Sequence, residues 1–248
     1  MFSEAHGHLR GDVDSAVRRA EEAGVELILV AGTDLSSSEK AVDLAARYEP
    51  VKACVGIHPW NADEYGGSAR GRLQELASMD GVVAVSEIGL DAVGRRNRTG
   101  EYVNKPLPMD VQLDAFLGQL DLAKEVGLPV IVHDRMPGYE VIQRLEERDI
   151  SNVGAAIHGF TKDETYAERL TGLGVYLSVS ARGILEPDNE GLRRAVAATP
   201  IEWLLTETDS GEPAGVVDAA REVAKLKGLT VEEVGRRATE NLRRLLRL

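Results

Sequence analysis

Short apolar runs alternate with amphipathic stretches along the whole chain of 248 residues. Each run is rich in Val, Ile or Leu and has the length of a buried parallel strand. The runs lie at 26–32, 51–58, 82–89, 128–133, 154–159, 175–180 and 203–209, and a short first strand leads into His6. Because a helical pattern follows each strand, the sequence predicts eight βα units around a parallel sheet.

The helical patterns carry recognisable end signals. Helices predicted over 12–24 and 108–127 both end on glycine, and Ser36 with Glu39 has the spacing of a capping box at the start of a helix over 36–48. Further helices are predicted near 68–79, 136–147, 163–172, 188–198 and 214–228, and from Thr230 to the end of the chain.

The spacing of the units favours one closed barrel. Successive strand ends lie 22 to 29 residues apart, except for one gap of 46 residues between Glu87 and His133. Near-equal units without a change in composition predict a single α/β domain over 1–248, a TIM (β/α)₈ barrel, and about 250 residues is an ordinary length for it. A doubly wound open sheet is the alternative, but no GxGxxG phosphate turn follows an early strand.

Charge and composition exclude several classes of protein. The chain has 29 Lys and Arg against 41 Asp and Glu, a net charge of −12, so its surface as a whole does not suit a phosphate backbone. No apolar run approaches the roughly 18 residues of a membrane span, and the first residues have no signal-peptide core. With Cys54 as its single cysteine, the chain is expected to be cytoplasmic, without a membrane or an obligate protein partner.

The long gap is explained by an insertion at 92–107. It is expected to be a loop, and it carries four basic residues against Glu101, a net charge of +3 in an acidic protein. A mobile, solvated loop and a substrate-binding loop both remain open for it.

All five histidines lie at or beside predicted strand ends. They are His6, His8, His58, His133 and His158. The C-terminal ends of barrel strands converge on the face where barrel enzymes keep their active sites. His6 and His8 are two residues apart on a strand, so both side chains point the same way and can reach one metal ion.

Two carboxylates join the histidines at this face. Glu87 ends the fourth strand and Asp209 ends the eighth. A carboxylate in an apolar strand is costly to bury unless it is paired or bound to a metal, although capping of backbone amides is the alternative for either residue alone. Four histidines with two carboxylates exceed the three protein ligands of a typical catalytic zinc. The set suits two divalent ions that share a carboxylate, an arrangement that promotes phosphoryl transfer and supplies the positive charge that the surface lacks.

Motifs with a consistent order and spacing cover nearly the whole chain. They are EAHGHL (4–9), VGIHPW (55–60), SEIGLD (86–91), QLDAFLGQLDLAKEVGLPVIVHDR (112–135), AIHGF (156–160), YLSVS (176–180), LLTETDS (204–210) and ENLRRLL (240–246). Together they resemble the TatD-type metal-dependent deoxyribonucleases, a branch of the amidohydrolase-like barrels.

The resemblance implies a barrel with a two-metal phosphodiesterase site that cleaves DNA by attack of a metal-activated water. One ion would be held by His6, His8 and Asp209, the other by His133 and His158, with Glu87 as the bridge. Asp209 would also take the proton from the attacking water, which makes Asp209 and Glu87 the candidate catalytic residues. His58 and Arg135 resemble the family's substrate contacts, although a salt bridge at the rim is the alternative for Arg135. Zn²⁺, Mn²⁺, Mg²⁺ and Co²⁺ all remain candidates, because mixed His and carboxylate ligands do not select among them.

Some positions depart from the family pattern. Glu4 stands where the family has Asp, and Ser86 replaces the usual Gly before the bridging Glu. After Asp209 the family has a basic stretch, but here Ser210 leads straight into Gly-Glu-Pro. The insertion at 92–107 is a candidate replacement for that stretch.

Two alternatives to a nuclease follow from these departures. The first is a hydrolase of a small ester, amide or phosphoester on the same metal pair. Amide-hydrolysing relatives often use a carbamylated Lys as the bridge, so Glu87 at the fourth strand favours the nuclease branch. The second is a metal-binding barrel without catalysis, which predicts that some metal ligands have been lost, whereas all six are present.

Two further residues have alternative roles. Asp91 either contacts substrate or caps the loop, and Trp60 either stacks on a base or packs under the rim.

Overall fold

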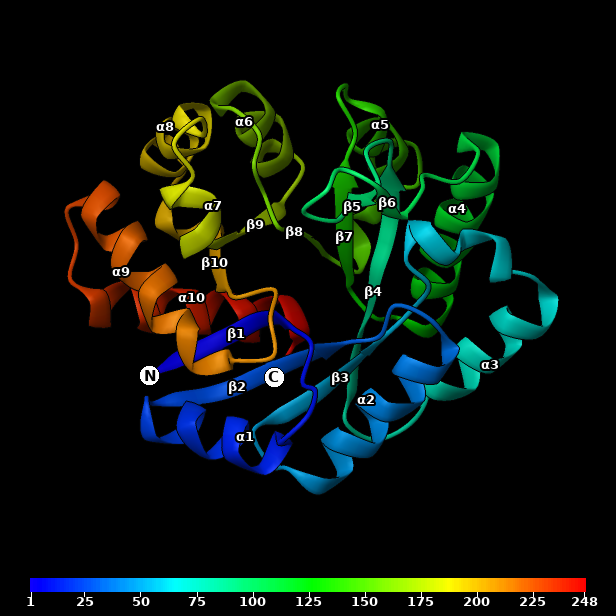
Figure 1. Cartoon of the computed structure of the whole chain (residues 1–248), viewed down its shortest axis with the longest axis horizontal. Helices are drawn as coiled ribbons and strands as arrows, with labels where there is room; N and C mark the ends of the chain where they lie inside the picture. Colours follow the sequence, from blue (N-terminus) through cyan, green and yellow to red (C-terminus); the bar gives the residue numbers. More distant parts are fainter.

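The computed structural model describes all residues, 1–248. Eight parallel strands form one sheet in the order β1-β2-β3-β4-β7-β8-β9-β10 (Figure 1). They are β1 (Phe2–Gly7), β2 (Val25–Ala31), β3 (Val51–Val55), β4 (Val82–Asp91), β7 (Val130–Arg135), β8 (Ala155–His158), β9 (Val175–Ser180) and β10 (Leu204–Glu207). The strands follow one another around the sheet in chain order, as the repeated βα units predict.

The first and last strands close the sheet into a barrel. Beyond the end of β10, the backbone N–H of Asp209 donates to the carbonyl of His6 at 3.0 Å, and that of His8 donates to Ser210 at 2.8 Å. The carboxylate of Glu4 accepts from the backbone N–H groups of His6 and Thr208, at 3.1 and 2.8 Å, and so ties the two chain segments together. The predicted TIM barrel is confirmed, and the open doubly wound sheet is excluded.

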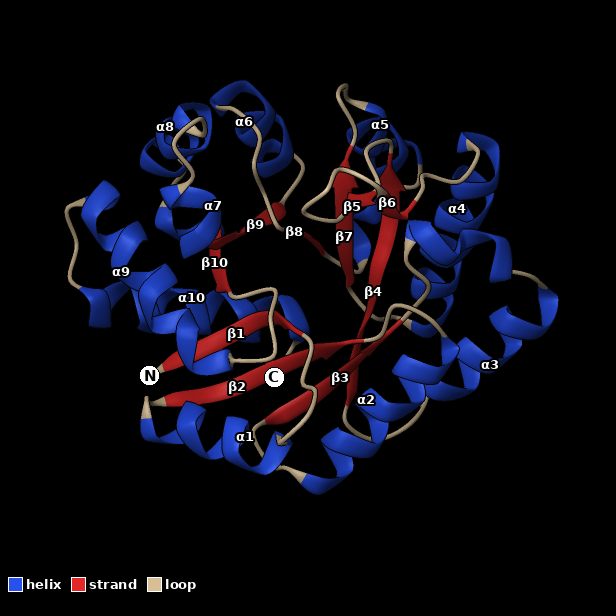
Figure 2. Cartoon of the chain, viewed as in Figure 1, coloured by secondary structure: helices blue, strands red, loops and turns tan.

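Helices surround the strands (Figure 2). They are α1 (Val13–Glu22), α2 (Leu35–Arg47), α3 (Gly67–Ala77), α4 (Met109–Val126), α5 (Glu140–Glu147), α6 (Glu164–Gly172), α7 (Ala181–Leu185), α8 (Glu190–Ala198), α9 (Val216–Lys227) and α10 (Val231–Leu246). Short 3₁₀ turns add η1 (Pro59–Glu64), η2 (Ile150–Asn152), η3 (Ile201–Trp203) and η4 (Pro213–Gly215). None of the helices combines the length and the apolar character that a membrane span needs.

One local prediction about the helices was wrong. The capping box of α2 is formed by Asp34 and Ser37, not by Ser36 and Glu39, because Asp34 accepts from the backbone N–H of Ser37 at 2.7 Å and the Ser37 hydroxyl accepts in return. The short helix α7 was not predicted. It begins where the hydroxyl of Ser180 accepts from the N–H of Gly183 at 3.1 Å.

Several strands end earlier or later than predicted. Strand β3 stops at Val55, three residues before His58, and β10 stops at Glu207, two residues before Asp209. Strand β4 instead continues to Asp91. His8, His58 and Asp209 therefore lie in the first residues of the loops that follow their strands.

The insertion at 92–107 is a short hairpin rather than an irregular loop. Strand β5 (Arg95–Arg96) pairs antiparallel with β6 (Tyr102–Asn104). Asp91 holds the base of this hairpin, because its Oδ1 accepts from the backbone N–H groups of Val93 and Gly94 at 2.7 Å each. The hairpin, residues 92–107, is therefore attached directly to the end of β4.

Apolar side chains fill the space between the barrel and its helices in one cluster of 53 buried residues, which includes Phe116, Leu120 and Ile142. A second cluster of 13 residues includes Cys54, Leu29 and Leu205 from the strands and Leu242 from α10. Cys54 itself is buried.

Gly89 is a position where only glycine fits. Its φ is +146°, and an added Cβ would lie 2.0 Å from the carbonyl oxygen of His133 on the neighbouring strand. We expect Gly89→Ala to lower the free energy of unfolding by at least the roughly 1–3 kcal/mol of an overpacked core, as measured by urea denaturation. Gly71→Ala is the control, because its Cβ would meet no atom within 4 Å on α3, and it should raise stability by about 0.5–1 kcal/mol. Equal midpoints for the two variants would contradict this account of β4.

Candidate metal centre

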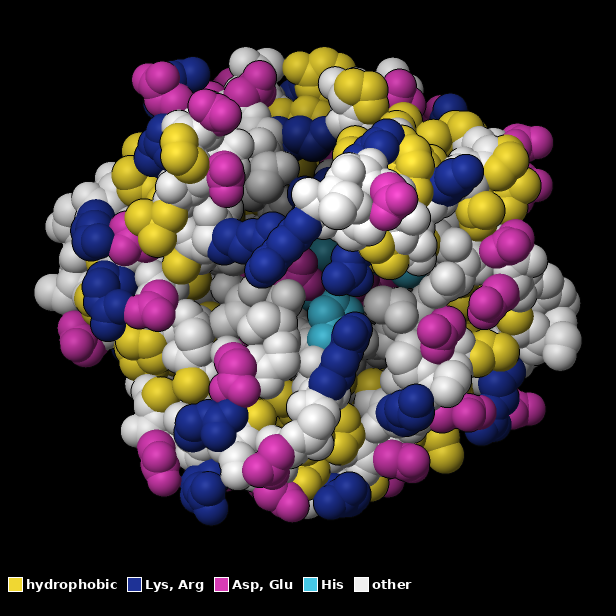
Figure 3. All heavy atoms as spheres, in the orientation of Figure 1, with side chains coloured by type: hydrophobic (Ala, Val, Ile, Leu, Met, Phe, Trp, Pro, Cys, Tyr) yellow, Lys and Arg dark blue, Asp and Glu magenta, His cyan; other side chains and the backbone are white.

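A cleft of about 740 Å³ opens at the C-terminal ends of the strands. Eighteen residues line it, and only two of them are hydrophobic. The space-filling view shows a hollow near the middle of this face, with histidines inside it and Lys and Arg side chains around it (Figure 3). All five histidines of the chain lie in or beneath this cleft, as their positions at the strand ends predict.

Glu87 lies at an irregularity in β4. Ser86 and Ile88 pair with successive residues of β7, Ile131 and Val132, so Glu87 is an extra residue in the register. Its φ is +58°, in the left-handed region that L residues rarely adopt. A bulge of this kind changes the direction in which a side chain points, and strained backbone is often found at functional sites. The carboxylate is only 3% exposed and faces the histidines.

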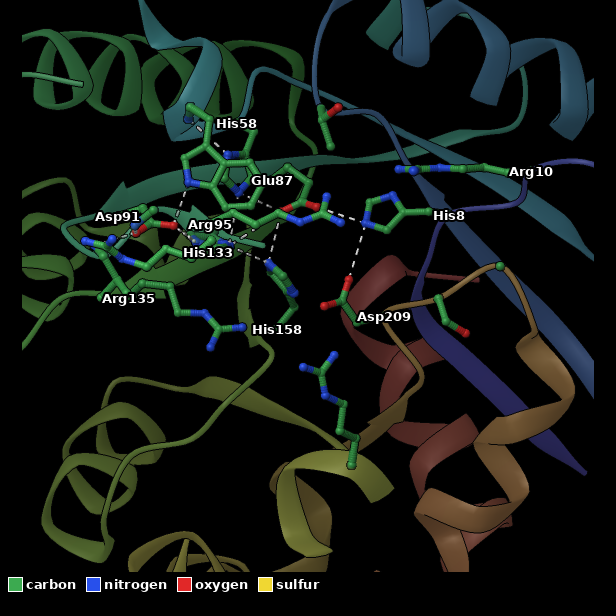
Figure 4. Close-up of a pocket in the computed structure, with 18 residues that line it drawn as sticks. His8, Arg10, His58, Glu87, Asp91, Arg95, His133, Arg135, His158 and Asp209 are labelled. Atoms are coloured by element: carbon green, nitrogen blue, oxygen red, sulfur yellow. Dashed lines mark hydrogen bonds and ion pairs between the residues drawn. The ribbon is translucent and has the colours of Figure 1, made fainter. Parts of the chain in front are cut away.

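The two oxygens of Glu87 face two different pairs of histidines (Figure 4). Oε1 lies 3.1 Å from Nε2 of both His6 and His8. Oε2 lies 3.0 Å from Nε2 of His158 and 3.8 Å from Nδ1 of His133, with Nε2 of His58 behind them at 3.9 Å. One carboxylate thus stands between the histidines of β1 and those of β7 and β8.

Asp209 completes the group beside β1. Its Oδ1 lies 3.3 Å from Nε2 of His8 and 4.0 Å from Nε2 of His6. Its φ is +50°, so both carboxylates of the site have strained backbone. Its side chain is 39% exposed, far more than that of Glu87. The structure therefore brings all six predicted metal ligands together, with Asp209 the one most open to the cleft.

Two histidines are held with a free ring nitrogen toward this centre. Nδ1 of His8 lies 3.1 Å from the carbonyl of Ala31, and Nε2 of His133 lies 3.1 Å from Oδ2 of Asp91. Since each of these acceptors requires an N–H, the opposite nitrogen, which faces Glu87, carries the lone pair when the ring is neutral. Metal-binding histidines usually have such a carbonyl or carboxylate behind them.

The ring of His58 is oriented the other way, with a protonated nitrogen toward the site. Its Nδ1 accepts the backbone N–H of Trp60 at 3.0 Å, so the neutral ring carries its proton on Nε2. That Nε2 points at Nδ1 of His133, 3.3 Å away. Burial and then the neighbouring His133 lower the pKa of His58 to about 3, which keeps the ring neutral. His58 therefore presents a donor to the site and suits a substrate oxygen better than a cation.

The protonation states of the other rings follow from their surroundings. Burial and then His158 lower the pKa of His6 to about 4, and burial lowers that of His133, so both are neutral at pH 7, the form that binds metals. Burial also acts to lower the pKa of His8, but hydrogen bonds to Asp209 and Glu87 outweigh it and raise this pKa to about 10. Without a cation, His8 is itself the positive charge between the two carboxylates.

Both carboxylates of the site stay ionised. Burial acts to raise the pKa of Glu87, but His158 and His6 hold it well below its ordinary value. Burial likewise acts to raise the pKa of Asp209, and the hydrogen bond from His8 outweighs it. Each can therefore offer a negatively charged oxygen to a cation at neutral pH.

The donor set fits divalent cations. Oε2 of Glu87 is buried and makes no hydrogen bond, and Nδ1 of His133 and Nε2 of His158 face each other at 3.2 Å. Ligand atoms in four groups lie within 4.8 Å of one another, namely His6–His8–Glu87, Glu87–His133–His158, His6–His158–Asp209 and His58–Asp91–His133. The first two of these groups share Glu87. Polar atoms that face one another in this way are satisfied together when a cation lies between them.

The structure shows contacts for three residues whose roles the sequence left open. Asp91 both caps the hairpin and accepts from His133, and it also accepts the indole N–H of Trp60 at 2.8 Å. Trp60 packs against His58, with ring centres 4.3 Å apart. Arg135 lines the cleft and makes no ion pair, so the alternative of a salt bridge at the rim is not formed.

Sequence reasoning missed other residues of the cleft. Arg10 and Arg182 also line it, together with Arg95 and Arg96 of the hairpin. The positive charge of the insertion was visible in the sequence. No local sequence pattern identifies Arg10 and Arg182 as residues of the cleft. They follow β1 and β9, which are distant in the sequence and come together only in the folded barrel.

Comparison with known proteins identifies relatives over the full length. A family model described as TatD related DNase matches residues 4–247. The chain is 30% identical to the metal-dependent hydrolase YabD of Bacillus subtilis, with 100% of both chains covered. It is 36% identical to a protein of Cronobacter sakazakii named 3'-5' ssDNA/RNA exonuclease TatD, over 80% of this chain and 72% of that one.

A solved structure has the same architecture. The crystal structure of YJJV, a TatD homologue of Escherichia coli, superposes with a TM-score of 0.86 at 27% sequence identity, covering 100% of this chain and 98% of that one. The relatives are named as metal-dependent hydrolases or nucleases, in agreement with the donor set of the cleft.

The contact between Asp91 and His133 predicts a measurable effect on metal affinity. Asp91→Asn removes the charge that orients His133, so we expect affinity for Mn²⁺ or Zn²⁺ to fall by about 10–100-fold, as measured by competition with a chromogenic chelator. Asp63→Asn, an exposed carboxylate on η1, is the matched control. Circular dichroism should show both variants folded. Unchanged affinity in folded Asp91→Asn would show that His133 does not depend on this partner.

Proposed function

The chain belongs to the TatD-related DNase family of metal-dependent hydrolases, and from this premise we propose that it hydrolyses phosphodiester bonds of DNA at a pair of divalent ions. The observation that carries the proposal is the position of Glu87, with one oxygen toward His6 and His8 and the other toward His158 and His133. Because these donors come from strands at both ends of the chain, we also infer that 1–248 works as one domain.

In this proposal each side of Glu87 holds one ion. His6, His8 and Asp209 would hold the first ion, His133 and His158 would hold the second, and Glu87 would supply a carboxylate to both. The orientations of His8 and His133, each with a protonated nitrogen directed away from the centre, support these assignments. Zn²⁺, Mn²⁺, Mg²⁺ and Co²⁺ are all compatible with nitrogen and oxygen donors, and availability selects among them.

When bound, divalent ions would lower the pKa of water and neutralise the negative charge of the phosphate, both of which phosphodiester hydrolysis needs. The protein's own residues do the rest. Oδ1 of Asp209 accepts the proton of the attacking water, since this carboxylate is ionised and open to the cleft. His58 donates from Nε2 to a phosphate oxygen, and Arg135 binds the phosphate through its planar guanidinium.

The depth of the site bears on the form of the substrate. Glu87, His133 and His158 are 3%, 5% and 4% exposed, so a phosphate must enter the cleft to reach them. A single strand or a strand end can enter more readily than an intact duplex. The name of the Cronobacter relative, an exonuclease of single-stranded DNA and RNA, agrees with this. The alternative, a small ester, amide or phosphoester, is favoured by the short segment after Asp209, which runs into η4 without a basic residue.

Metal content tests the paired site directly. Protein purified without chelator should contain close to two equivalents of divalent metal by elemental analysis, because two sets of donors share Glu87. Glu87→Gln should lose metal at both positions, whereas Glu39→Gln, on the surface of α2, should retain it. One equivalent or none in the unaltered protein would refute the paired site.

Cleavage assays test the reaction and the role of Asp209. Labelled single- and double-stranded DNA should be cleaved in the presence of Mg²⁺, Mn²⁺, Co²⁺ or Zn²⁺. Asp209→Asn should reduce turnover by at least about 10²–10⁴-fold, the usual contribution of a general base, while Asp43→Asn on α2 should not.

Parallel assays identify the source of any loss. Metal analysis of Asp209→Asn separates loss of the proton acceptor from loss of a ligand. Failure to cleave DNA with any of the four metals, together with activity on a panel of small esters and amides, would favour the alternative function.

A further inference from the structure

Five arginines line the cleft around the metal centre. They are Arg10, Arg95, Arg96, Arg135 and Arg182. Arg10 follows β1, Arg95 and Arg96 belong to the hairpin after β4, Arg135 ends β7, and Arg182 lies in α7 after β9. Since β1, β4, β7 and β9 are spread around the barrel, the guanidinium groups surround the mouth of the cleft rather than one side of it. Figure 4 shows Arg10, Arg95 and Arg135 on different segments around Glu87.

These arginines differ from most others on the surface. Nine arginines elsewhere form ion pairs with Asp or Glu, as Arg19 does with Glu212 and Arg70 with Glu125. None of the five in the cleft forms one, although the chain carries a net charge of −12. The cleft contains these five arginines against three carboxylates, Glu87, Asp91 and Asp209, so the arginines alone exceed the carboxylates by two charges.

Contacts within the hairpin orient Arg96. Asp91 fixes the base of the hairpin through Val93 and Gly94, and an added Cβ at Gly94 would lie 2.5 Å from the carbonyl of Asn104. The guanidinium of Arg96 lies over the ring of Tyr102 at 3.7 Å and donates to the carbonyl of Gly100 at 2.7 Å. An arginine oriented in this way loses less conformational entropy when it binds a phosphate.

We propose that Arg95 and Arg96 bind phosphates of the substrate strand next to the scissile one, and that they make a strand with several phosphates the preferred substrate over a small phosphoester. The inference rests on the proposed function and adds to it. His58 and Arg135 are the proposed contacts of the phosphate at the metal centre, and a single phosphate would leave the other arginines of the cleft without a partner. A strand that crosses the mouth gives them phosphates to bind.

The hairpin in this way takes the place of the basic stretch that is missing after Asp209. No Lys or Arg follows Asp209 until Arg221 on α9, where it pairs with Asp218. Contacts of this type are electrostatic, so they weaken as the salt concentration rises.

The test compares two substrates and two variants of the metal-loaded enzyme. The substrates are a single-stranded oligonucleotide of about twelve nucleotides, within the span of typical single-strand sites, and bis(4-nitrophenyl) phosphate, which has one phosphate. The variants are Arg95→Gln/Arg96→Gln and Arg98→Gln/Lys105→Gln. Both remove two positive charges from the same hairpin, but Arg98 and Lys105 do not line the cleft.

We expect Arg95→Gln/Arg96→Gln to raise KM for the oligonucleotide about tenfold or more, and to reduce the slope of log(kcat/KM) against log salt by about 1.4, since each lost phosphate contact on a single strand removes about 0.7. Hydrolysis of bis(4-nitrophenyl) phosphate should stay within about twofold of the unaltered enzyme. The control variant should resemble the unaltered enzyme on both substrates.

Other outcomes overturn the proposal in distinguishable ways. Equal losses in the two variants would show a general effect of charge, and equal losses on the two substrates would place the hairpin's effect at the reacting phosphate. An unchanged KM and salt slope would show that the strand does not touch these arginines, while the proposed function stands. Failure of the unaltered enzyme to cleave any oligonucleotide would instead contradict the proposed nuclease function, and with it the binding of the strand by Arg95 and Arg96.

Discussion

Closure of the barrel between β1 and β10 is the constraint on which the site depends. Two backbone hydrogen bonds join residues 6 and 8 to residues 209 and 210, and Glu4 adds a side-chain link between the same segments. Through this closure His6, His8 and Asp209 lie side by side although they come from opposite ends of the chain. Because all eight strands are parallel, the same geometry brings His133 and His158 to that end of the barrel.

Within the closed barrel, the position of Glu87 divides the histidine ligands into two groups, one facing each of its carboxylate oxygens. A regular β4 would not turn this side chain as the bulge does, and the positive φ of Glu87 and of Asp209 shows that the backbone is strained at both carboxylates. Burying a carboxylate is costly, and here five imidazoles have a ring nitrogen within 4 Å of the Glu87 carboxylate. Backbone strain at both residues, together with the burial of Glu87, agrees with selection for a reaction rather than for stability.

The electrostatics of the cleft differ from those of the molecule. An acidic chain repels a polyanion at long range, yet the cleft gathers five unpaired arginines beside donors for divalent cations. Asp91 connects the two, since one of its oxygens holds the arginine hairpin and the other holds His133. A substitution in the hairpin can therefore affect the metal centre through the side chain of Asp91. For that reason the control substitutions at Arg98 and Lys105 lie in the same hairpin.

By itself the sequence determined the eight βα units, the family and the six candidate ligands, because strand apolarity, motif order and the chemistry of His, Asp and Glu are properties of local segments. It also located the insertion and its positive charge. Only the tertiary structure decided that the insertion is a hairpin, that Glu87 turns at a bulge between two histidine pairs, that His58 presents a donor, and that Arg10 and Arg182 join the hairpin's arginines. Each of these depends on backbone register or on contacts between residues far apart in the chain, which no local pattern records.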